Sequence, residues 1–193
     1  MFVWGWLLGY LLGSIPFAYI VTWLKKVDIR TVGSGNPGTT NILRTFGKGW
    51  AAFVLVGDMG KGLFAMLLMH LIVPTGQMVL IGTALGAVMG HAWPLFFRFR
   101  GGKVVATSAA VLFVLSPVGI GLAALMFFLV LILTRYVSLA SMLAGLTVWL
   151  YTLVMTSSLV LHEVVTLIFA LLLYRHTANM KRLVHGEERK LAK

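Results

Sequence analysis

The chain has 193 residues, of which 60% are apolar, and its formal net charge is +11. This length suits one domain, and the apolar content lies far outside the soluble norm, which predicts a single integral-membrane domain over residues 1–193. Cysteine is absent, which excludes thiol nucleophiles, disulfides and cysteine-bound metals. The basic residues lie between apolar runs, so anionic lipid and anionic substrates are favoured over nucleic acid as partners.

Seven apolar segments predict an all-α, polytopic membrane protein with seven transmembrane helices. The stretch 104–134 lacks charge but is too long for one ordinary span, and Ser116-Pro117 interrupts it, so we divide it into a short helix and a full one. An uncharged turn is expected at residues 74–76 and a polar turn at 156–158. The charged tail 175–193 is expected to form an amphipathic or loop segment. The expected helices are, in order, 2–24, 50–72, 77–97, the two helices within 104–134, 137–155 and 159–174.

The charges predict the orientation of these helices. Lys25 and Lys26 follow the first apolar run and no basic residue precedes it, which is the reverse of a cleavable signal. With the N-terminus outside, all 16 Lys and Arg fall in inner segments or, for Lys61, near the inner end of the second helix. The positive-inside rule therefore predicts an external N-terminus and a cytoplasmic C-terminus.

Glycines recur at every fourth position in two of the expected helices. This pattern predicts surfaces at which two helices pack closely. The glycines concerned are Gly5, Gly9 and Gly13 in the first helix and Gly82, Gly86 and Gly90 in the third.

A polar, glycine-rich segment after the first helix is the strongest candidate for an anion site. Its glycines allow backbone N–H groups to converge on an anion, and a new helix beginning near Thr39 would add hydroxyl and amide groups. Arg44 adds a planar positive group one helical turn further on. The candidate phosphate-binding residues here are Ser34, Gly35, Asn36, Gly38, Thr40, Asn41 and Arg44. Turn chemistry alone is also consistent with a plain loop between two helices.

Two further segments emerge on the same predicted face of the membrane. One contains Gly101, Gly102 and Lys103, with Thr107 one helical turn beyond. The other is the tail, in which His176, Asn179 and Arg182 share a helical spacing and Glu188 follows. Together with the first segment, they favour one anion-binding site that works by positioning and charge neutralisation rather than through a protein nucleophile.

Other kinds of site find little support. Gly33-x-Gly35-x-x-Gly38 matches a dinucleotide fingerprint but lacks a βαβ context, and no P-loop is present. The histidine spacings predict neither a zinc site nor the His-x4-Asp pair of one glycerolipid acyltransferase class. Asp58 and Lys61 are expected to pair with each other, and His91 is expected to be structural. Any one basic residue, taken alone, is also explained as a lipid-headgroup anchor.

Four segments in order resemble the PlsY family of bacterial acyl-phosphate:glycerol-3-phosphate acyltransferases, and the resemblance covers nearly the whole chain. The matches are Ser34 to Asn41, Asp58 to Gly62, Gly90-His91 leading to Gly101-Gly102-Lys103, and the tail segment with His176, Asn179, Arg182, Leu183, Gly186 and Glu188. Three positions, in two segments, depart from the family pattern. Val104 replaces a usual glycine, and Thr177 and Met180 replace a usual Arg and Ile.

The resemblance implies transfer of a fatty acyl group from acyl phosphate to the sn-1 hydroxyl of glycerol 3-phosphate, in the cytoplasmic (inner) membrane of a bacterium. It implies membrane lipid as surroundings and no cofactor, metal, nucleic acid or obligate protein partner. Ser34, Arg44 and Lys103 would hold phosphate, the Gly101-Gly102 amides would line a phosphate or oxyanion pocket, and His176 with Asn179 would orient a substrate. Glu188 would be a partner of basic residues. Either His176 or a substrate phosphate would accept the proton.

Two other classes of protein remain as alternatives. An organic-phosphate transporter would carry polar groups near the middle of the membrane, often in repeated halves, whereas the ionisable residues here crowd one interface. A structural protein that binds anionic lipid would lose no phosphate-dependent activity when Arg44 or Lys103 is replaced by Ala.

Overall fold

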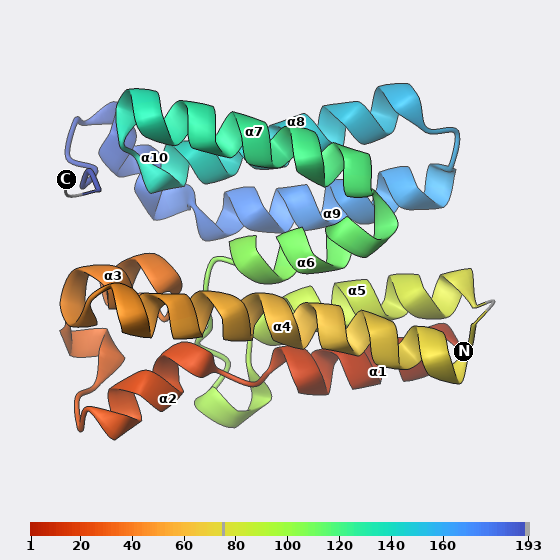
Figure 1. Cartoon of the computed structure of the whole chain (residues 1–193), viewed down its shortest axis with the longest axis horizontal. Helices are drawn as coiled ribbons and strands as arrows, with labels where there is room; N and C mark the ends of the chain where they lie inside the picture. Colours follow the sequence, from red (N-terminus) through yellow and green to blue (C-terminus); the bar gives the residue numbers. More distant parts are fainter. Residues whose placement is uncertain (75, 192–193) are drawn as a thin grey trace. The chain divides into compact units, whose positions relative to one another are not determined.

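The structure is a computed structural model that describes residues 1–74 and 76–191. Within these residues every regular element is helical, which confirms the all-α prediction (Figure 1). The chain divides into two compact units, Met1–Val111 and Leu112–Lys193. Thr75, in the turn expected at 74–76, and residues 192–193 of the charged tail lie outside the described part.

The first unit contains α1 to α5 and the beginning of α6. Its first apolar segment is not the single helix expected over 2–24, because the chain breaks at residues 14–16, where Pro16 has no N–H to continue the helix. The third segment likewise ends earlier than expected, at Ala92, two residues before Pro94. The elements are α1 Phe2–Gly13, α2 Phe17–Leu24, η1 Ile29–Thr31, α3 Thr39–Phe46, α4 Lys48–Ile72, α5 Gln77–Ala92, η2 Leu95–Phe97 and α6 Val105–Leu115.

The two glycine stripes face each other where α1 packs along α5. A Cβ added to Gly9 would collide with the backbone carbonyl of Thr83, and one added to Gly86 would collide with the carbonyl of Trp6. The other four stripe glycines meet the opposite backbone in the same way. The predicted close packing is therefore confirmed, and the two backbones approach within a distance that no larger residue permits.

The second unit contains the end of α6 and four further helices: α7 Pro117–Thr134, α8 Val137–Met155, α9 Leu159–Arg175 and α10 Thr177–Val184. The predicted break at Ser116-Pro117 is confirmed, with Pro117 at the first position of α7, where its missing N–H removes no helical hydrogen bond. The charged tail begins as the short helix α10. It bends away from α9 by 56° at His176.

The described residues contain five helical segments long and apolar enough to cross a membrane, or six if α9 and α10 together form one bent span. α6 has only 11 residues. At 1.5 Å per residue it covers about 16 Å, roughly half the hydrocarbon thickness. The protein is a multi-pass integral membrane protein, and the seventh span expected from the sequence depends on α6.

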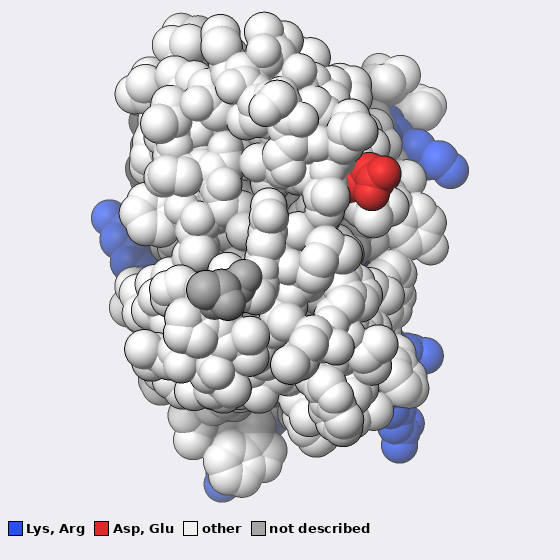
Figure 2. All heavy atoms as spheres, turned by 90° about the vertical axis from the view of Figure 1, so that its right-hand side faces the viewer, with Lys and Arg blue, Asp and Glu red and all other residues white. Residues whose placement is uncertain are grey.

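The exposed surface also has the character of a lipid-facing one. On α7, for example, Leu125, Ile132 and Leu133 are each at least 70% exposed. In the face shown in Figure 2, uncharged side chains dominate and the visible Lys and Arg side chains lie at its margins. Apolar exposure on this scale is disfavoured in water but stable in the hydrocarbon of a bilayer.

Candidate functional site

The glycine-rich segment after α2 forms a loop that closes onto α3. Gly33 and Gly35 have φ angles of 61° and 70°, in the left-handed region that favours glycine, and α3 begins at Thr39 as expected. The buried amide of Asn41 fixes this loop. Its Oδ1 accepts from the Ser34 N–H at 2.8 Å, and its Nδ2 donates to the Val32 carbonyl at 3.1 Å. Asn41 was predicted to bind phosphate, and these two bonds give it a role in shaping the loop.

The remaining predicted residues of this loop are accessible to different degrees. Ser34 and Arg44 are exposed, whereas Gly35, Asn36, Gly38 and Thr40 are half-buried. An exposed hydroxyl and an exposed guanidinium group on one loop–helix unit are suited to bind an anion. Direct contact of these residues with phosphate stays a prediction.

The Gly101-Gly102 segment lies against the C-terminal end of α5. The Gly101 N–H donates to the Ala92 carbonyl at 3.2 Å, and the Gly102 N–H donates to the His91 carbonyl at 3.1 Å. Both N–H groups are thus paired within the backbone, and the anion pocket expected at these two amides stays a prediction. A Cβ on Gly102 would lie 3.0 Å from the carbonyl oxygen of Pro37, so this segment meets the first loop, as predicted.

The residues after Gly102 enter α6. Lys103 is half-buried, and Val104 is fully buried with a φ of 60°. Thr107 is also fully buried, and its hydroxyl donates to the backbone carbonyl of Asp58 at 2.9 Å. Since that proton is used within the protein, Thr107 joins α6 to α4, and the phosphate contact predicted for it stays a prediction.

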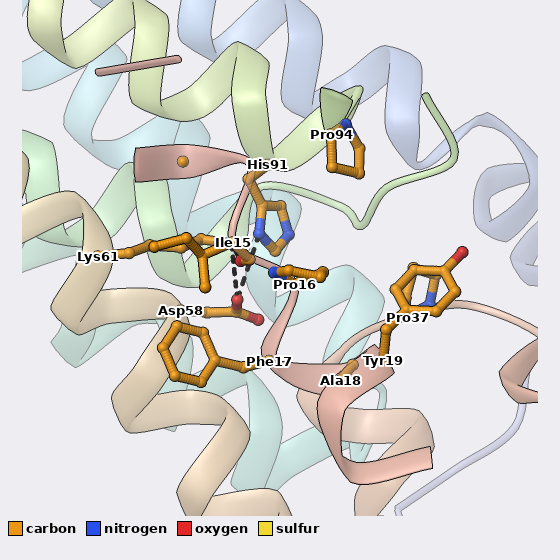
Figure 3. A pocket seen from close by; sticks show the side chains of 11 residues that line it. Ile15, Pro16, Phe17, Ala18, Tyr19, Pro37, Asp58, Lys61, His91 and Pro94 are labelled. Carbon is orange, nitrogen blue, oxygen red and sulfur yellow. Dashed lines mark hydrogen bonds and ion pairs between the residues drawn. The ribbon is translucent and has the colours of Figure 1, made fainter. Parts of the chain in front are cut away.

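Asp58 and Lys61 of α4 and His91 of α5 form a buried polar cluster of three side chains (Figure 3). Its His91 ring lies against Gly102. Lys61 Nζ is 2.9 Å from Asp58 Oδ1, which confirms the expected pairing. His91 Nδ1 is 3.5 Å from the same carboxylate oxygen. Lys61 also donates to the Ile15 carbonyl at 2.8 Å, at the break between α1 and α2. The cluster borders a small pocket that Pro37 of the first loop also lines.

The predicted tail residues form a second group, within the second unit. His176 lies at the bend between α9 and α10, is 1% exposed, and its Nδ1 is 2.8 Å from the Leu172 carbonyl. With Nδ1 as donor, Nε2 is the basic nitrogen of the neutral ring. Asn179 Nδ2 donates to Glu188 Oε1 at 2.6 Å, and Arg182 Nε donates to Glu188 Oε2 at 2.7 Å. The predicted pairing of Glu188 with a basic residue is confirmed.

Glu188 is thus the centre of this second group. Ser138 of α8 adds a third donor, 2.8 Å from Oε1. Burial by itself raises the pKa of Glu188, but the hydrogen bonds from Ser138, Arg182 and Asn179 outweigh it and hold the pKa below its usual range. The carboxylate stays ionised at neutral pH and fixes the amide of Asn179. Within the described residues, the buried Oδ1 of Asn179 has no hydrogen-bond partner.

The predicted residues therefore fall into two groups, and their assembly into one site stays a prediction. The first group is Ser34, Gly35, Asn36, Gly38, Thr40, Asn41, Arg44, Gly101, Gly102, Lys103 and Thr107, and the second is His176, Asn179, Arg182 and Glu188. Sequence reasoning missed the contact of Ser138 with Glu188 and the contact of His91 with Asp58. Asp58, His91 and Glu188 each lay in a motif segment, whereas Ser138 carried no such signal. In the described part of the chain, no three His, Asp or Glu side chains are grouped as a metal site requires.

Comparison with known proteins gives matches over nearly the whole chain. Residues 3–186 match the family model described as "Glycerol-3-phosphate acyltransferase". A protein of that name from Rubrobacter xylanophilus is 46% identical over 95% of this chain and 92% of its own length. One from Desulforudis audaxviator is 45% identical over 94% of this chain and 91% of its own length.

Two solved structures are similar to this one throughout. They are described as crystal structures of PlsY (YgiH), an integral membrane glycerol 3-phosphate acyltransferase, in a glycerol 3-phosphate form and a lysophosphatidic acid form. The first is 37% identical with a TM-score of 0.93, covering 99% of this chain and 96% of the other. The second is 36% identical with a TM-score of 0.90, covering 99% and 95%.

Proposed function

This chain belongs to the glycerol-3-phosphate acyltransferase family and is an enzyme of that class, and we propose that its acyl donor is acyl phosphate. The acceptor would be the sn-1 hydroxyl of glycerol 3-phosphate, and the products 1-acylglycerol 3-phosphate (lysophosphatidic acid) and phosphate. The observation that carries the acceptor and the product is the similarity, over 99% of the chain, to the two crystal forms described by those compounds.

The transfer is direct. The glycerol hydroxyl oxygen forms a bond to the acyl carbonyl carbon, the bond from that carbon to the phosphate oxygen breaks, and inorganic phosphate leaves. The hydroxyl proton passes either to His176 or to a phosphate oxygen of a substrate. Because the donor is already a mixed anhydride, and the chain has no cysteine, an acyl-enzyme is not needed.

The two groups of residues divide the work between charge and orientation. Ser34, Arg44 and Lys103 hold phosphate. They lower the repulsion between the two anionic substrates and stabilise the negative charge that develops on the leaving phosphate. His176 and Asn179 orient the reacting groups, and the buried Oδ1 of Asn179 is suited to accept a hydrogen bond from a substrate hydroxyl. Arg182 and Glu188 hold Asn179 in place.

The proposed topology has seven spans, an external N-terminus and a cytoplasmic C-terminus, in the inner membrane of a bacterium. The whole chain acts as one domain, with the active site facing the cytoplasm. The distribution of Lys and Arg supports this orientation. The active site would then open to the side of the membrane where soluble glycerol 3-phosphate is available.

The decisive experiment is an assay of the purified full-length protein with acyl phosphate and labelled glycerol 3-phosphate, without thiol carrier, metal or nucleotide. We expect labelled lysophosphatidic acid and stoichiometric phosphate. A parallel assay replaces acyl phosphate with an acyl thioester of the same chain length. Product from the thioester but not from acyl phosphate would overturn the proposed donor while leaving the acceptor in place.

A further inference from the structure

The buried polar cluster of Asp58, Lys61 and His91 does more than pair charges. All three side chains are at most 7% exposed, and a buried ionised group is stable only if it is paired and hydrogen-bonded. Lys61 has both a charge partner and a hydrogen-bond partner. It contacts the carboxylate of Asp58 and donates to the carbonyl of Ile15 at the α1–α2 break. The contact between Asp58 and His91 is not required to pair the Lys61 charge.

The imidazole of His91 connects Asp58 to the Gly101-Gly102 segment. One edge of the ring places Nδ1 3.5 Å from Asp58 Oδ1. The other edge lies against Gly102, since a Cβ on that glycine would collide with Nε2. The backbone carbonyl of His91 accepts the N–H of the same glycine. Figure 3 shows the ring beside the Asp58 carboxylate, and both side chains line the small pocket that Pro37 also lines.

We propose that His91, held by Asp58, is a positioning residue that fixes the backbone of Gly101-Gly102 and thereby the place of Lys103 for binding phosphate. Because the amides of both glycines are used within the backbone, the segment acts by where it puts the next residue rather than by its own N–H groups. The need for glycine at 102 follows from the imidazole and the Pro37 carbonyl, which leave no room for a Cβ. This inference rests on the proposed role of Lys103.

The test is a double-mutant cycle between His91 and Gly102 in the full-length enzyme. His91→Ala, Gly102→Ala and the double variant are compared by kcat and by KM for each of the two substrates. We expect His91→Ala to raise KM about 10-fold or more for the substrate whose KM rises in Lys103→Ala. We also expect the loss of kcat/KM in the double variant to be smaller, by at least ~3-fold, than the product of the losses in the two single variants. The reason is that removing the ring makes room for the new Cβ. The relief is partial, since Pro37 still crowds that Cβ.

Matched controls separate positioning from general stability. His70→Ala removes an exposed histidine from α4, and Gly49→Ala adds a Cβ where no atom lies within 4 Å. Both variants should keep the wild-type kcat and KM. The fold-effects of Gly49→Ala and His91→Ala should multiply, as expected for independent sites. His91→Gln can bridge the same partners, so its KM should lie between those of the wild type and His91→Ala.

Two outcomes would overturn the proposal: unchanged KM values in His91→Ala with only a lower melting temperature, or a double variant whose loss equals the product of the single losses. Calorimetric titration with inorganic phosphate covers two remaining cases, an inactive variant and a wild-type enzyme that does not use acyl phosphate. Weaker phosphate binding in His91→Ala than in the wild type supports the positioning role, and unchanged binding in that variant rejects it. A failure of the donor assignment would appear in the wild-type assay and not in this comparison.

Discussion

At Val104 a β-branched side chain occupies a backbone conformation that normally requires glycine. Its φ is 60°, and the residue is fully buried directly after Lys103. The left-handed conformation costs a non-glycine residue about 1–2 kcal/mol, whereas burying a valine side chain stabilises by about 1.5–3 kcal/mol. Packing therefore outweighs strain, which explains how valine is tolerated at a position where the family resemblance implies glycine. The sequence showed the departure, but only the backbone angle shows its physical meaning.

We expect Val104→Gly to be at least as stable as Val104→Ala, because glycine relieves the strained φ that alanine retains. Val111, equally buried but in the middle of α6, is the matched control. There glycine should be less stable than alanine by about 1 kcal/mol, the ordinary helical penalty. Thermal unfolding of the four variants in detergent measures both differences. Equal glycine penalties at the two positions would show that Val104 is not strained.

For His176 we expect replacement by Ala to lower kcat by about 10²-fold or more, as the loss of a proton acceptor usually does. The Nδ1 contact with Leu172 presents Nε2 as the basic nitrogen. His185 is the control, because its Nδ1 makes the same kind of contact with Lys181 but the residue is exposed. His185→Ala should change kcat only a few-fold. A similarly small loss for His176→Ala at saturating substrate would leave a substrate phosphate as the proton acceptor.

At the level of helices, spacing predicted packing better than it predicted ends. The repeated glycines were sufficient to predict the close contact of α1 with α5, since only small residues let two backbones meet. The break at Pro16 was missed because apolar residues continue on both sides of it. Apolar composition predicts which segments are buried, but it does not show where the backbone hydrogen bonds of a helix are interrupted. Its consequence, a carbonyl of Ile15 that accepts from Lys61 of α4, depends on tertiary contact and has no local signal.

The interface of α1 with α5 should not tolerate even one added methyl group. Gly86→Ala places a Cβ against the Trp6 carbonyl and 2.8 Å from the Tyr10 nitrogen, so the helices must separate. We expect a loss of about 1–3 kcal/mol in stability, as in other overpacked cores. Gly60→Ala on α4, with no atom within 4 Å of the new Cβ, should be neutral or slightly stabilising. Equal melting temperatures for the two variants in detergent would contradict close packing.

The segment that follows α10 should loosen in acid, because Glu188 joins it to α8 and α10. Its folded-state pKa is lowered, so its stabilisation is present above the ordinary Glu pKa of about 4.3 and disappears as the pH falls through the folded value. Hydrogen exchange, corrected for intrinsic rates, should show lost protection of residues 185–191 in that range. Glu188→Gln should already lack this protection at pH 7, and Glu187→Gln, at an exposed neighbour, should not. Acid-independent protection in the wild type would contradict the role of Glu188.

For the whole molecule, the sequence predicted the membrane class and the family, but the number of crossings depends on α6 and α9. Both helices are apolar, yet α6 is too short by length alone and α9 counts only together with α10. Parity connects this count to orientation. An external N-terminus and a cytoplasmic C-terminus require an odd number of spans, so six is excluded by that orientation, while five and seven remain. Charge placement favours seven, because the charge-free turn 156–158 then lies outside.

Single cysteines in this cysteine-free chain distinguish the three counts. With seven spans, Val3→Cys and Ser157→Cys should react with a membrane-impermeant maleimide in intact bacterial cells, whereas His185→Cys should react only after permeabilisation. All three positions are exposed in the structure, so a missing reaction reports the side of the membrane rather than burial. With five spans and α9 not crossing, positions 157 and 185 would both be protected. With six, positions 3 and 185 would react alike. Either pattern would reject the short helix α6 as a crossing and, with it, the seven-span topology.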